Sequence, residues 1–380
     1  MGGQYTTVIM ARVKQWHQFL LVILGFCFVE VQAQAIRPDS AHQRNLRITP
    51  LPVVYYSPET RLGFGALIAT NFETDKIRGG ETRSSYTQTY FLYTINKQYD
   101  FGTMGRIYFP QNKSILYAKI NYMYFPEYYY GTETEKPLIK KDTIEYQRQG
   151  IDLRFFRAWK KNHYFGLATR YNNITNIDGG AGNFSIDHPT GFDDYHILGI
   201  APALTIETRD SFVYPRNGIF FEALYYIYPD LGSKSFGFQQ LRLDVRKYFP
   251  VTLFSDIDAL AFQFTANVNT GNVPFKDMAD IGGASMMRGY YTGFYRYRNL
   301  YAFQVEYRAH LLGRFGINVW AGGALTPTKW YTLFDHALKP NAGIGLRIMM
   351  NKQDRLNVRV DQGFGKEGQN GFYLDIAEAF

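Results

Sequence analysis

The segment Gln240-Leu-Arg-Leu-Asp-Val-Arg-Lys-Tyr248 decides the fold, because apolar and charged residues alternate along it. Leu241, Leu243 and Val245 share one face of an extended chain, and the charged residues between them share the other. Side chains of a β-strand point alternately to the two sides of a sheet. The alternation therefore predicts a strand with one apolar face and one ionic face.

The same period of two residues recurs at 151–155, 301–310 and 356–361. A water-soluble β-sandwich shows this period as well, because it turns its apolar faces inward and its charges toward water. Clusters of tyrosine such as 128–130 and 225–226 favour a transmembrane barrel instead, since aromatic girdles mark the two interfaces of such barrels. An N-terminal export signal favours the same alternative.

The composition fits a β-rich membrane protein. Of 380 residues, 46% are hydrophobic and 19% are charged, which excludes a disordered chain. The 31 Tyr and 31 Phe are more than a compact core needs, so many must lie on an outer surface. Beyond the first thirty residues no apolar run approaches the roughly 18 residues of a membrane-spanning helix, which excludes a helical membrane protein.

Sixteen segments fit the strand pattern, and bacterial barrels of this kind have an even number of strands. Most connections alternate between long ones, which we expect outside the cell, and tight ones near Lys160, Gly313 and Lys352, which we expect in the periplasm. We predict an all-β fold, a transmembrane antiparallel β-barrel of about 16 strands. The predicted strands are 48–57, 61–72, 84–95, 99–110, 114–127, 145–157, 163–173, 195–207, 217–229, 235–248, 257–269, 299–311, 315–323, 341–350, 354–363 and 371–380.

The N-terminus has the pattern of a secretory signal peptide. Two basic residues precede an apolar run at 19–29, and small residues up to Ala33 provide a cleavage site. The alternative is an N-terminal helical anchor, for which the apolar run is too short. We predict a signal peptide at 1–33, a short N-terminal tether at 34–47 and a transmembrane β-barrel at 48–380.

Four motifs lie in order along the later strands. Each is weak alone, but together, each at its own strand, they are more specific. They comprise a turn with Arg209, Asp210, Pro215 and Gly218; a long loop with Arg288, Gly289 and Tyr290; two inward-facing charges, Arg347 and Asp361; and a closing strand that ends in Phe380.

These motifs resemble the barrel of the BamA/TamA-type outer-membrane assembly and translocation family, the bacterial surface-antigen group. The resemblance covers essentially the whole predicted mature chain. It implies a multi-pass barrel in the outer membrane of a Gram-negative bacterium, with Phe380 in the C-terminal signal that the assembly machinery reads. Two features depart from the family: the periplasmic POTRA repeats are absent, and Ala321 stands where an inward-facing acid is expected in the thirteenth strand.

The loop at 270–298 is long enough to fold back into a barrel lumen. An arginine in a confined lumen needs a carboxylate, and the alternation at 356–361 turns Asp361 inward. We therefore predict an ion pair between Arg288 and Asp361, with Gly289 allowing a sharp turn beside it. The alternative is that Arg288 lies in a solvated outer loop and pairs with nothing.

Other chemistry is sparse in this sequence. The histidines have no metal-ligand spacing, and the single cysteine, Cys27, is lost with the signal peptide, so we expect no metal, cofactor or disulfide. His310 and Glu306 could form an acid–base pair of a barrel hydrolase, but no serine is placed with them and a polar cluster in the lumen is the preferred interpretation. We expect no enzymatic activity, and no nucleic-acid binding, because an exported barrel offers no basic surface stripe.

The resemblance implies a barrel that assists insertion or translocation of proteins or lipids. We expect contacts with outer-membrane lipids and with an outer-membrane or periplasmic protein partner that supplies the periplasmic domains. The alternative is a structural barrel or a passive pore for small solutes. Pro50 and Pro52 in the first strand also predict a poorly hydrogen-bonded closing seam, because proline cannot donate to a β-ladder.

Overall fold

The computed structural model describes residues 46–74, 82–135, 137, 142–334, 336–351 and 355–380. The predicted signal peptide at 1–33 and all but the end of the predicted tether at 34–47 lie outside these residues. The first strand begins at Leu46, two positions before its predicted start.

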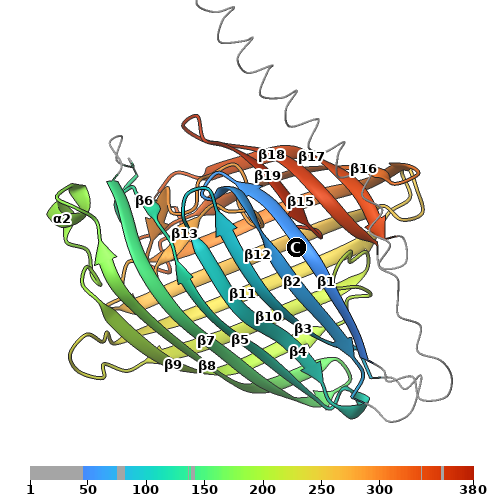
Figure 1. Ribbon diagram of the computed structural model, residues 1–380, viewed down its shortest axis with the longest axis horizontal. Helices are drawn as coiled ribbons and strands as arrows, with labels where there is room; N and C mark the ends of the chain where they lie inside the picture. Colours follow the sequence, from blue (N-terminus) through green and yellow to red (C-terminus); the bar gives the residue numbers. More distant parts are fainter. Residues whose placement is uncertain (1–45, 75–81, 136, 138–141, 335, 352–354) are drawn as a thin grey trace, which may run out of the picture. The chain divides into compact units, whose positions relative to one another are not determined.

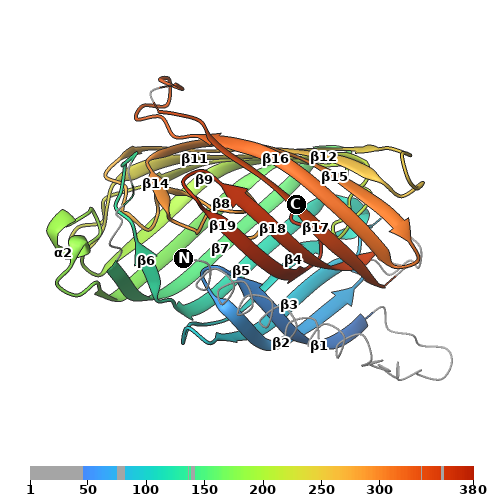
Figure 2. The same cartoon turned by 90° about the horizontal axis from the view of Figure 1, so that it is seen from above.

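Sixteen antiparallel strands form one closed barrel (Figures 1 and 2), which confirms the predicted fold class. Each strand pairs with the next barrel strand along the chain, and the last returns to the first. The barrel strands are β1 Leu46–Ser57, β2 Arg61–Phe72, β3 Ser85–Thr94, β4 Tyr99–Tyr108, β5 Ser114–Tyr124, β7 Asp142–Lys160, β8 His163–Asp178, β9 Tyr195–Glu207, β10 Gly218–Tyr228, β11 Phe238–Pro250, β12 Ala259–Gly271, β15 Asn299–Leu312, β16 Phe315–Leu325, β17 Lys339–Asn351, β18 Leu356–Gly365 and β19 Asn370–Ile376.

The connections at one end of the barrel carry most of the remaining elements. Strand β6 (Glu127–Tyr129) pairs with β7, and β13 (Ala279–Ile281) pairs with β14 (Tyr295–Tyr297) inside the long connection between β12 and β15. A short helix, α2 (Asn183–Asp187), lies between β8 and β9 at this same end (Figure 1). The other end has tighter turns and one short 3₁₀ helix, Pro110–Asn112. No helix in the described part of the chain is long and apolar enough to cross a membrane.

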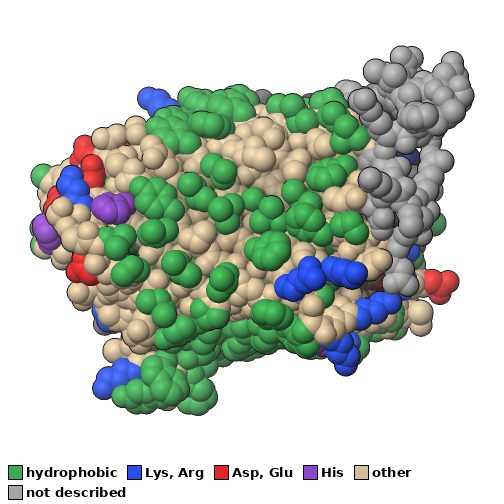
Figure 3. Space-filling view, turned by 90° about the horizontal axis from the view of Figure 1, so that it is seen from below, with side chains coloured by type: hydrophobic (Ala, Val, Ile, Leu, Met, Phe, Trp, Pro, Cys, Tyr) green, Lys and Arg blue, Asp and Glu red, His purple; other side chains and the backbone are tan. Residues whose placement is uncertain are grey.

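Alternation along each strand separates a lipid-facing side from a lumen side. On β15, Phe303 is 49% exposed, whereas Gln304, Glu306 and Arg308 are buried inside. Hydrophobic side chains are spread over the barrel wall seen in Figure 3, and charged side chains gather toward its two ends. A closed ladder satisfies the backbone polar groups that lipid cannot hydrogen-bond.

The predicted closing strand, 371–380, is wrong at its C-terminal end. Strand β19 stops at Ile376, and the last four residues leave the barrel wall. Ala377 turns the chain with a φ of +69°, and its backbone N–H donates to the carbonyl of Asn357 at 2.8 Å. The course of these last four residues is determined by their contacts with the lumen wall, which an alternating sequence pattern cannot predict.

Candidate functional site

The long connection between β12 and β15, residues 272–298, folds into the barrel and is called the lumen loop below. Its two short strands, β13 and β14, form a hairpin whose tip carries Arg288, Gly289 and Tyr290. The loop buries Ile281, Met287 and Tyr290 in one apolar cluster. Its backbone can lie in the lumen because protein surrounds it there, rather than lipid.

Arg288 is completely buried and binds two carboxylates. Its Nη1 donates to Asp361 Oδ2 at 2.6 Å, the ion pair expected from the sequence, and its Nη2 donates to Glu306 Oε2. Glu306 is the residue that sequence reasoning missed as a partner, although the alternation at 301–310 already turned it inward. The two carboxylates come from β18 and β15, so one guanidinium ties the lumen loop to two separate strands.

The guanidinium of Arg288 also lies over the ring of Trp320, with its Cζ 3.8 Å from the ring centroid. Trp320 faces the lumen from β16, whereas Ala321 is exposed on the outer wall. The expectation that position 321 faces inward is therefore wrong, because the alternation of β16 turns its even-numbered residues to the lumen. An aromatic ring at 320 takes the place beside Arg288 where an acid was expected.

Asp361 lies at the centre of a wider ion network on the lumen wall. Arg347 Nη1 donates to Asp361 Oδ1 at 2.6 Å, and Arg359 Nη1 donates to Oδ2 at 3.0 Å. Arg308 Nε binds Glu306 Oε1 at 2.8 Å on the neighbouring side. Buried charges are costly unless they are paired, and this network pairs each of them with opposite charges.

Gly289 and Tyr290 fix the loop tip against β18. Gly289 has a φ of +114°, and a Cβ added there would lie 2.6 Å from the backbone nitrogen of Phe364. Its N–H donates to the hydroxyl of Tyr373 at 3.0 Å. Tyr290 is buried, and its hydroxyl donates to the carbonyl of Pro340 at 2.7 Å. Only glycine allows this approach of two backbones.

Further ion pairs hold the base of the lumen loop to the barrel rim. Lys276 Nζ and Arg296 Nη2 bind Glu127 Oε1 on β6 at 2.5 and 3.0 Å. Burial lowers the pKa of Lys276 to about 8, against the opposing effect of Glu127. Burial alone would raise the pKa of Glu127, but Lys276 and Arg296 lower it below its usual range. At the same end of the barrel, Thr292 N and Oγ1 donate to Glu59 in the turn between β1 and β2, at 2.7 and 2.9 Å.

The turn motif between β9 and β10 has a structural role. Arg209 forms a bidentate pair with Glu207, at 2.9 Å from Nε and 2.6 Å from Nη2. Asp210 Oδ1 accepts two backbone N–H groups further along the turn, and Gly218 closes it with a φ of +111°. The carbonyl of Pro215 accepts a hydrogen bond from Arg308 Nη1 at 3.5 Å, which connects this turn to the lumen network.

The C-terminal tail, residues 377–380, lies inside the mouth of the barrel. The carbonyl of Phe380 accepts from Arg308 Nη2 at 2.8 Å, and the Arg308 guanidinium lies 5.0 Å from the Phe380 ring centroid. Glu378 accepts from Arg347 Nε at 2.8 Å and from Asn357 Nδ2 at 2.7 Å. Phe380 is 5% exposed and packs with Tyr248, so the tail belongs to the lumen network.

The seam between β1 and β19 is the weakest junction of the barrel. Its ladder consists of one residue pair, Tyr56 with Leu374, whereas β1 pairs with β2 along its full length of 12 residues. The single pair lies beyond Pro50 and Pro52, which agrees with the poor seam expected from the sequence. Two strand edges therefore carry backbone groups that this ladder does not use.

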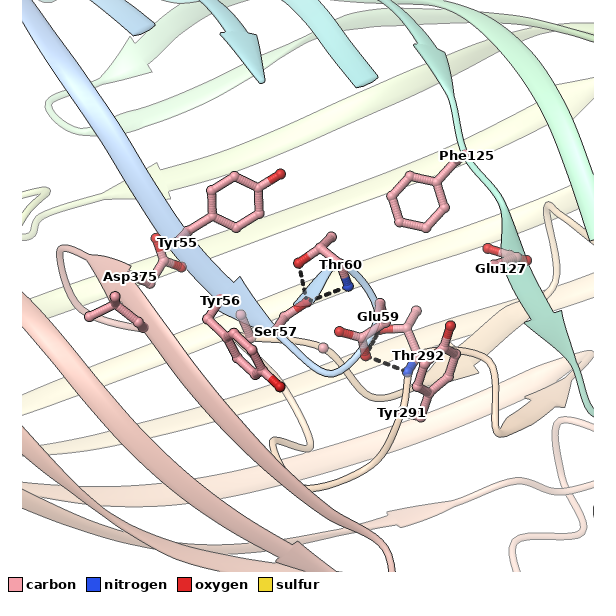
Figure 4. A pocket seen from close by; sticks show the side chains of 13 residues that line it. Tyr55, Tyr56, Ser57, Glu59, Thr60, Phe125, Glu127, Tyr291, Thr292 and Asp375 are labelled. Atoms are coloured by element: carbon pink, nitrogen blue, oxygen red, sulfur yellow. Dashed lines mark hydrogen bonds between the residues drawn. The ribbon is translucent and has the colours of Figure 1, made fainter. Parts of the chain in front are cut away.

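A cavity of about 220 Å³ lies where the seam meets the lumen loop (Figure 4). Tyr55 and Tyr56 of β1 line one side, and Tyr291 and Thr292 of the loop line another. Glu59 points toward Thr292, the contact drawn as a dashed line in Figure 4.

No three His, Cys, Asp or Glu side chains are grouped as a metal site in the residues that the structure describes.

A family model, the Omp85 superfamily domain, matches residues 61–353. This chain belongs to the Omp85 superfamily. Family and fold together imply a β-barrel of a Gram-negative outer membrane.

Several solved structures resemble the barrel of this chain at low sequence identity. BamA from Haemophilus ducreyi lacking POTRA domains 1–3 matches with a TM-score of 0.56 and 12% identity, over 88% of this chain and 70% of that one. CdiB from Escherichia coli matches at 0.56 and 9%, over 89% and 63%. CdiB from Acinetobacter baumannii matches at 0.53 and 10%, over 88% and 60%. This chain therefore spans less than two thirds of either CdiB chain. A search of curated proteins finds no match.

Proposed function

We propose that this barrel is a non-enzymatic factor that assists insertion or translocation of proteins or lipids at the outer membrane. The observation that carries the proposal is the seam, where one residue pair closes a barrel whose other junctions are ladders of six or more pairs. A lateral opening there would expose two strand edges toward the membrane. Free edges are templates on which an incoming strand can pair.

The lumen loop supports this proposal over a passive pore. A pore for small solutes needs open space through its lumen, and here the loop tip is held inside by Arg288, Gly289 and Tyr290. The ties to Asp361 and Glu306 lie on the β15 to β19 side of the seam. Movement of the loop and opening of the seam would therefore affect the same wall.

The partners follow from the position of the barrel. Outer-membrane lipids contact its apolar wall. We further propose an outer-membrane or periplasmic protein partner that supplies a client-receiving part, because the barrel and its loops take up the described part of the chain from Leu46 onward. The shared fold with BamA and CdiB supports this assignment without identifying a client.

A reversible lock on the seam tests the proposal. Tyr56→Cys with Leu374→Cys places two thiols on directly opposed residues, at a separation that a disulfide can bridge. The matched control is Ile68→Cys with Thr89→Cys, which are opposed in the continuous β2–β3 ladder. Both pairs are introduced into the producing bacterium from which the wild-type copy has been removed.

We expect the oxidised seam pair to change the protein and lipid composition of the outer membrane in the same way as loss of the protein, and reductant to restore it. The control variant should show the wild-type membrane composition in both the oxidised and the reduced state. Normal composition with a fully oxidised seam would contradict a lateral opening. A defect confined to small-solute uptake would favour the passive pore.

A further inference from the structure

The segment between β16 and β17 bends outward over the rim of the barrel. Residues 326–334, called the aromatic finger below, are held to β15 by two side chains. Asn299 Nδ2 donates to two backbone carbonyls at the base of the finger, at 3.2 and 3.1 Å, and the Tyr301 hydroxyl donates to the carbonyl of Trp330 at 2.8 Å. Asn299 and Tyr301 alternate along β15 in step with Phe303, so they lie on the same face of the sheet as this lipid-facing residue. The finger therefore extends on the lipid side of the wall.

The finger presents large apolar side chains that the protein leaves uncovered. Trp330 is 57% exposed, Tyr331 59%, Leu333 39% and Phe334 83%. In Figure 2 the segment between β16 and β17 projects away from the barrel wall. Figure 3 shows hydrophobic side chains with a basic one beside them on a projection from the barrel. Such a group of exposed apolar residues marks a contact surface.

Local hydrogen bonds hold the finger in this conformation. Thr332 N donates to the carbonyl of Lys329 at 3.0 Å, and Lys329 N donates to Thr332 Oγ1 at 3.3 Å. The turn is therefore closed by its own residues. Its apolar side chains are displayed at the tip, and Lys329 lies beside them with its Nζ 5.8 Å from the Tyr331 ring centroid.

We infer that the aromatic finger is a membrane anchor whose side chains insert into the outer leaflet beside β15. It is continuous with the lipid-facing wall, to which Tyr301 ties it. Tryptophan and tyrosine are enriched at the headgroup level of membranes, and Lys329 complements anionic headgroups there. The backbone of the finger stays at the headgroup layer, because irregular backbone is not found in exposed hydrocarbon. This role is independent of the seam and the proposed function.

Tryptophan fluorescence tests the anchor directly. Among the described residues, Trp159 is exposed at the opposite end of the barrel and Trp320 is buried under Arg288. In a Trp159→Phe background, lipid therefore has access to Trp330 alone. The full mature protein is reconstituted in vesicles of phosphatidylglycerol and phosphatidylcholine whose acyl chains carry bromine either near the headgroup or near the chain end.

We expect bromine near the headgroup to quench more strongly than bromine near the chain end, and Trp330→Phe in the same background to lose most of that quenching. Emission of Trp330 that neither lipid quenches, and that a water-soluble quencher reduces, would overturn the inference. Heat-modifiability shows that each variant is folded.

A spin label gives a second measurement that leaves all tryptophans in place. The predicted mature chain has no cysteine, so Phe334→Cys can be labelled uniquely with a nitroxide. We expect greater collision with oxygen, which dissolves in lipid, than with a water-soluble nickel chelate. The reverse order would overturn the anchor, as would a photo-crosslinker at 334 that captures a protein instead of lipid in native membranes.

Discussion

Replacing Arg288 by alanine removes the contact on which the lumen loop depends most. The substitution breaks the bonds to Asp361 and Glu306 and removes the cation from the face of Trp320. All of these groups are buried, so water cannot replace the lost partner unless the loop moves. We expect the loop tip to leave its site on β18.

The size of the effect follows from what each carboxylate retains. Breaking a buried ion pair costs about 3–5 kcal/mol, and the cation–π contact adds to it. Glu306 keeps Arg308 at 2.8 Å and Asp361 keeps Arg347 at 2.6 Å, which places the loss near the lower limit. We expect a decrease of about 3 kcal/mol in the free energy of unfolding for Arg288→Ala, and a similar decrease for Asp361→Ala. The double variant should lose less than the sum, by about 1–3 kcal/mol of coupling.

The assay compares thermal unfolding of the four forms in detergent with single-channel conductance in planar bilayers. A freed loop should make the conductance larger or noisier. Arg298→Ala is the matched control, because this arginine lies in the same loop but is 37% exposed and 3.6 Å from Glu133, a pair worth about 0–1 kcal/mol. Additive losses together with unchanged conductance would refute the docking argument.

Deleting Phe380 should release the tail from Arg308, lowering the thermal midpoint and reducing outer-membrane levels while secretion continues; normal levels and midpoint would argue against both roles. Gly289→Ala should undock the loop, because its Cβ meets backbone, and should reproduce the conductance of Arg288→Ala; Gly232→Ala, also at positive φ but in open space, should not. Lys276 has a pKa near 8 when folded and 10.5 as its ordinary value, so the unfolded chain holds this proton more tightly between these values and the contribution of Lys276 to stability should rise with pH there. Thermal midpoints across that window test this, and Lys276→Met should abolish the rise.

Strand pattern and fold could be predicted from the sequence because alternation is local. The bounds of β2 and β9 agree with the predicted strands, since both strands lie between clear turn residues. The pairing of Arg288 with Asp361 could also be predicted from the sequence, because an arginine enclosed in a barrel lumen needs an inward-facing acid. The alternation at 301–310 also turns Glu306 inward, so the same argument predicts Glu306 as a second partner of Arg288.

Features that depend on contacts between distant segments could not be predicted from the sequence. The inward path of the tail depends on Arg308 and Arg347 meeting Phe380 and Glu378, residues that no sequence period relates. The stacking of Trp320 under Arg288 likewise depends on the register of β16, because a shift of one residue would place Ala321, and not Trp320, on the lumen side. Positions one apart in a strand lie on opposite faces of the sheet, so a single-residue error reverses the inferred chemistry.

The inward tail has a practical consequence for anyone who purifies this protein. The linker of an affinity tag fused after Phe380 would have to pass out of the barrel mouth beside Arg308, whose Nη2 donates to the Phe380 carbonyl. Such a fusion would report the behaviour of a barrel with its last residues displaced. A tag inserted in an exposed connection such as that around Gly232, where nothing lies within 4 Å of an added Cβ, would leave the chain end in its native place.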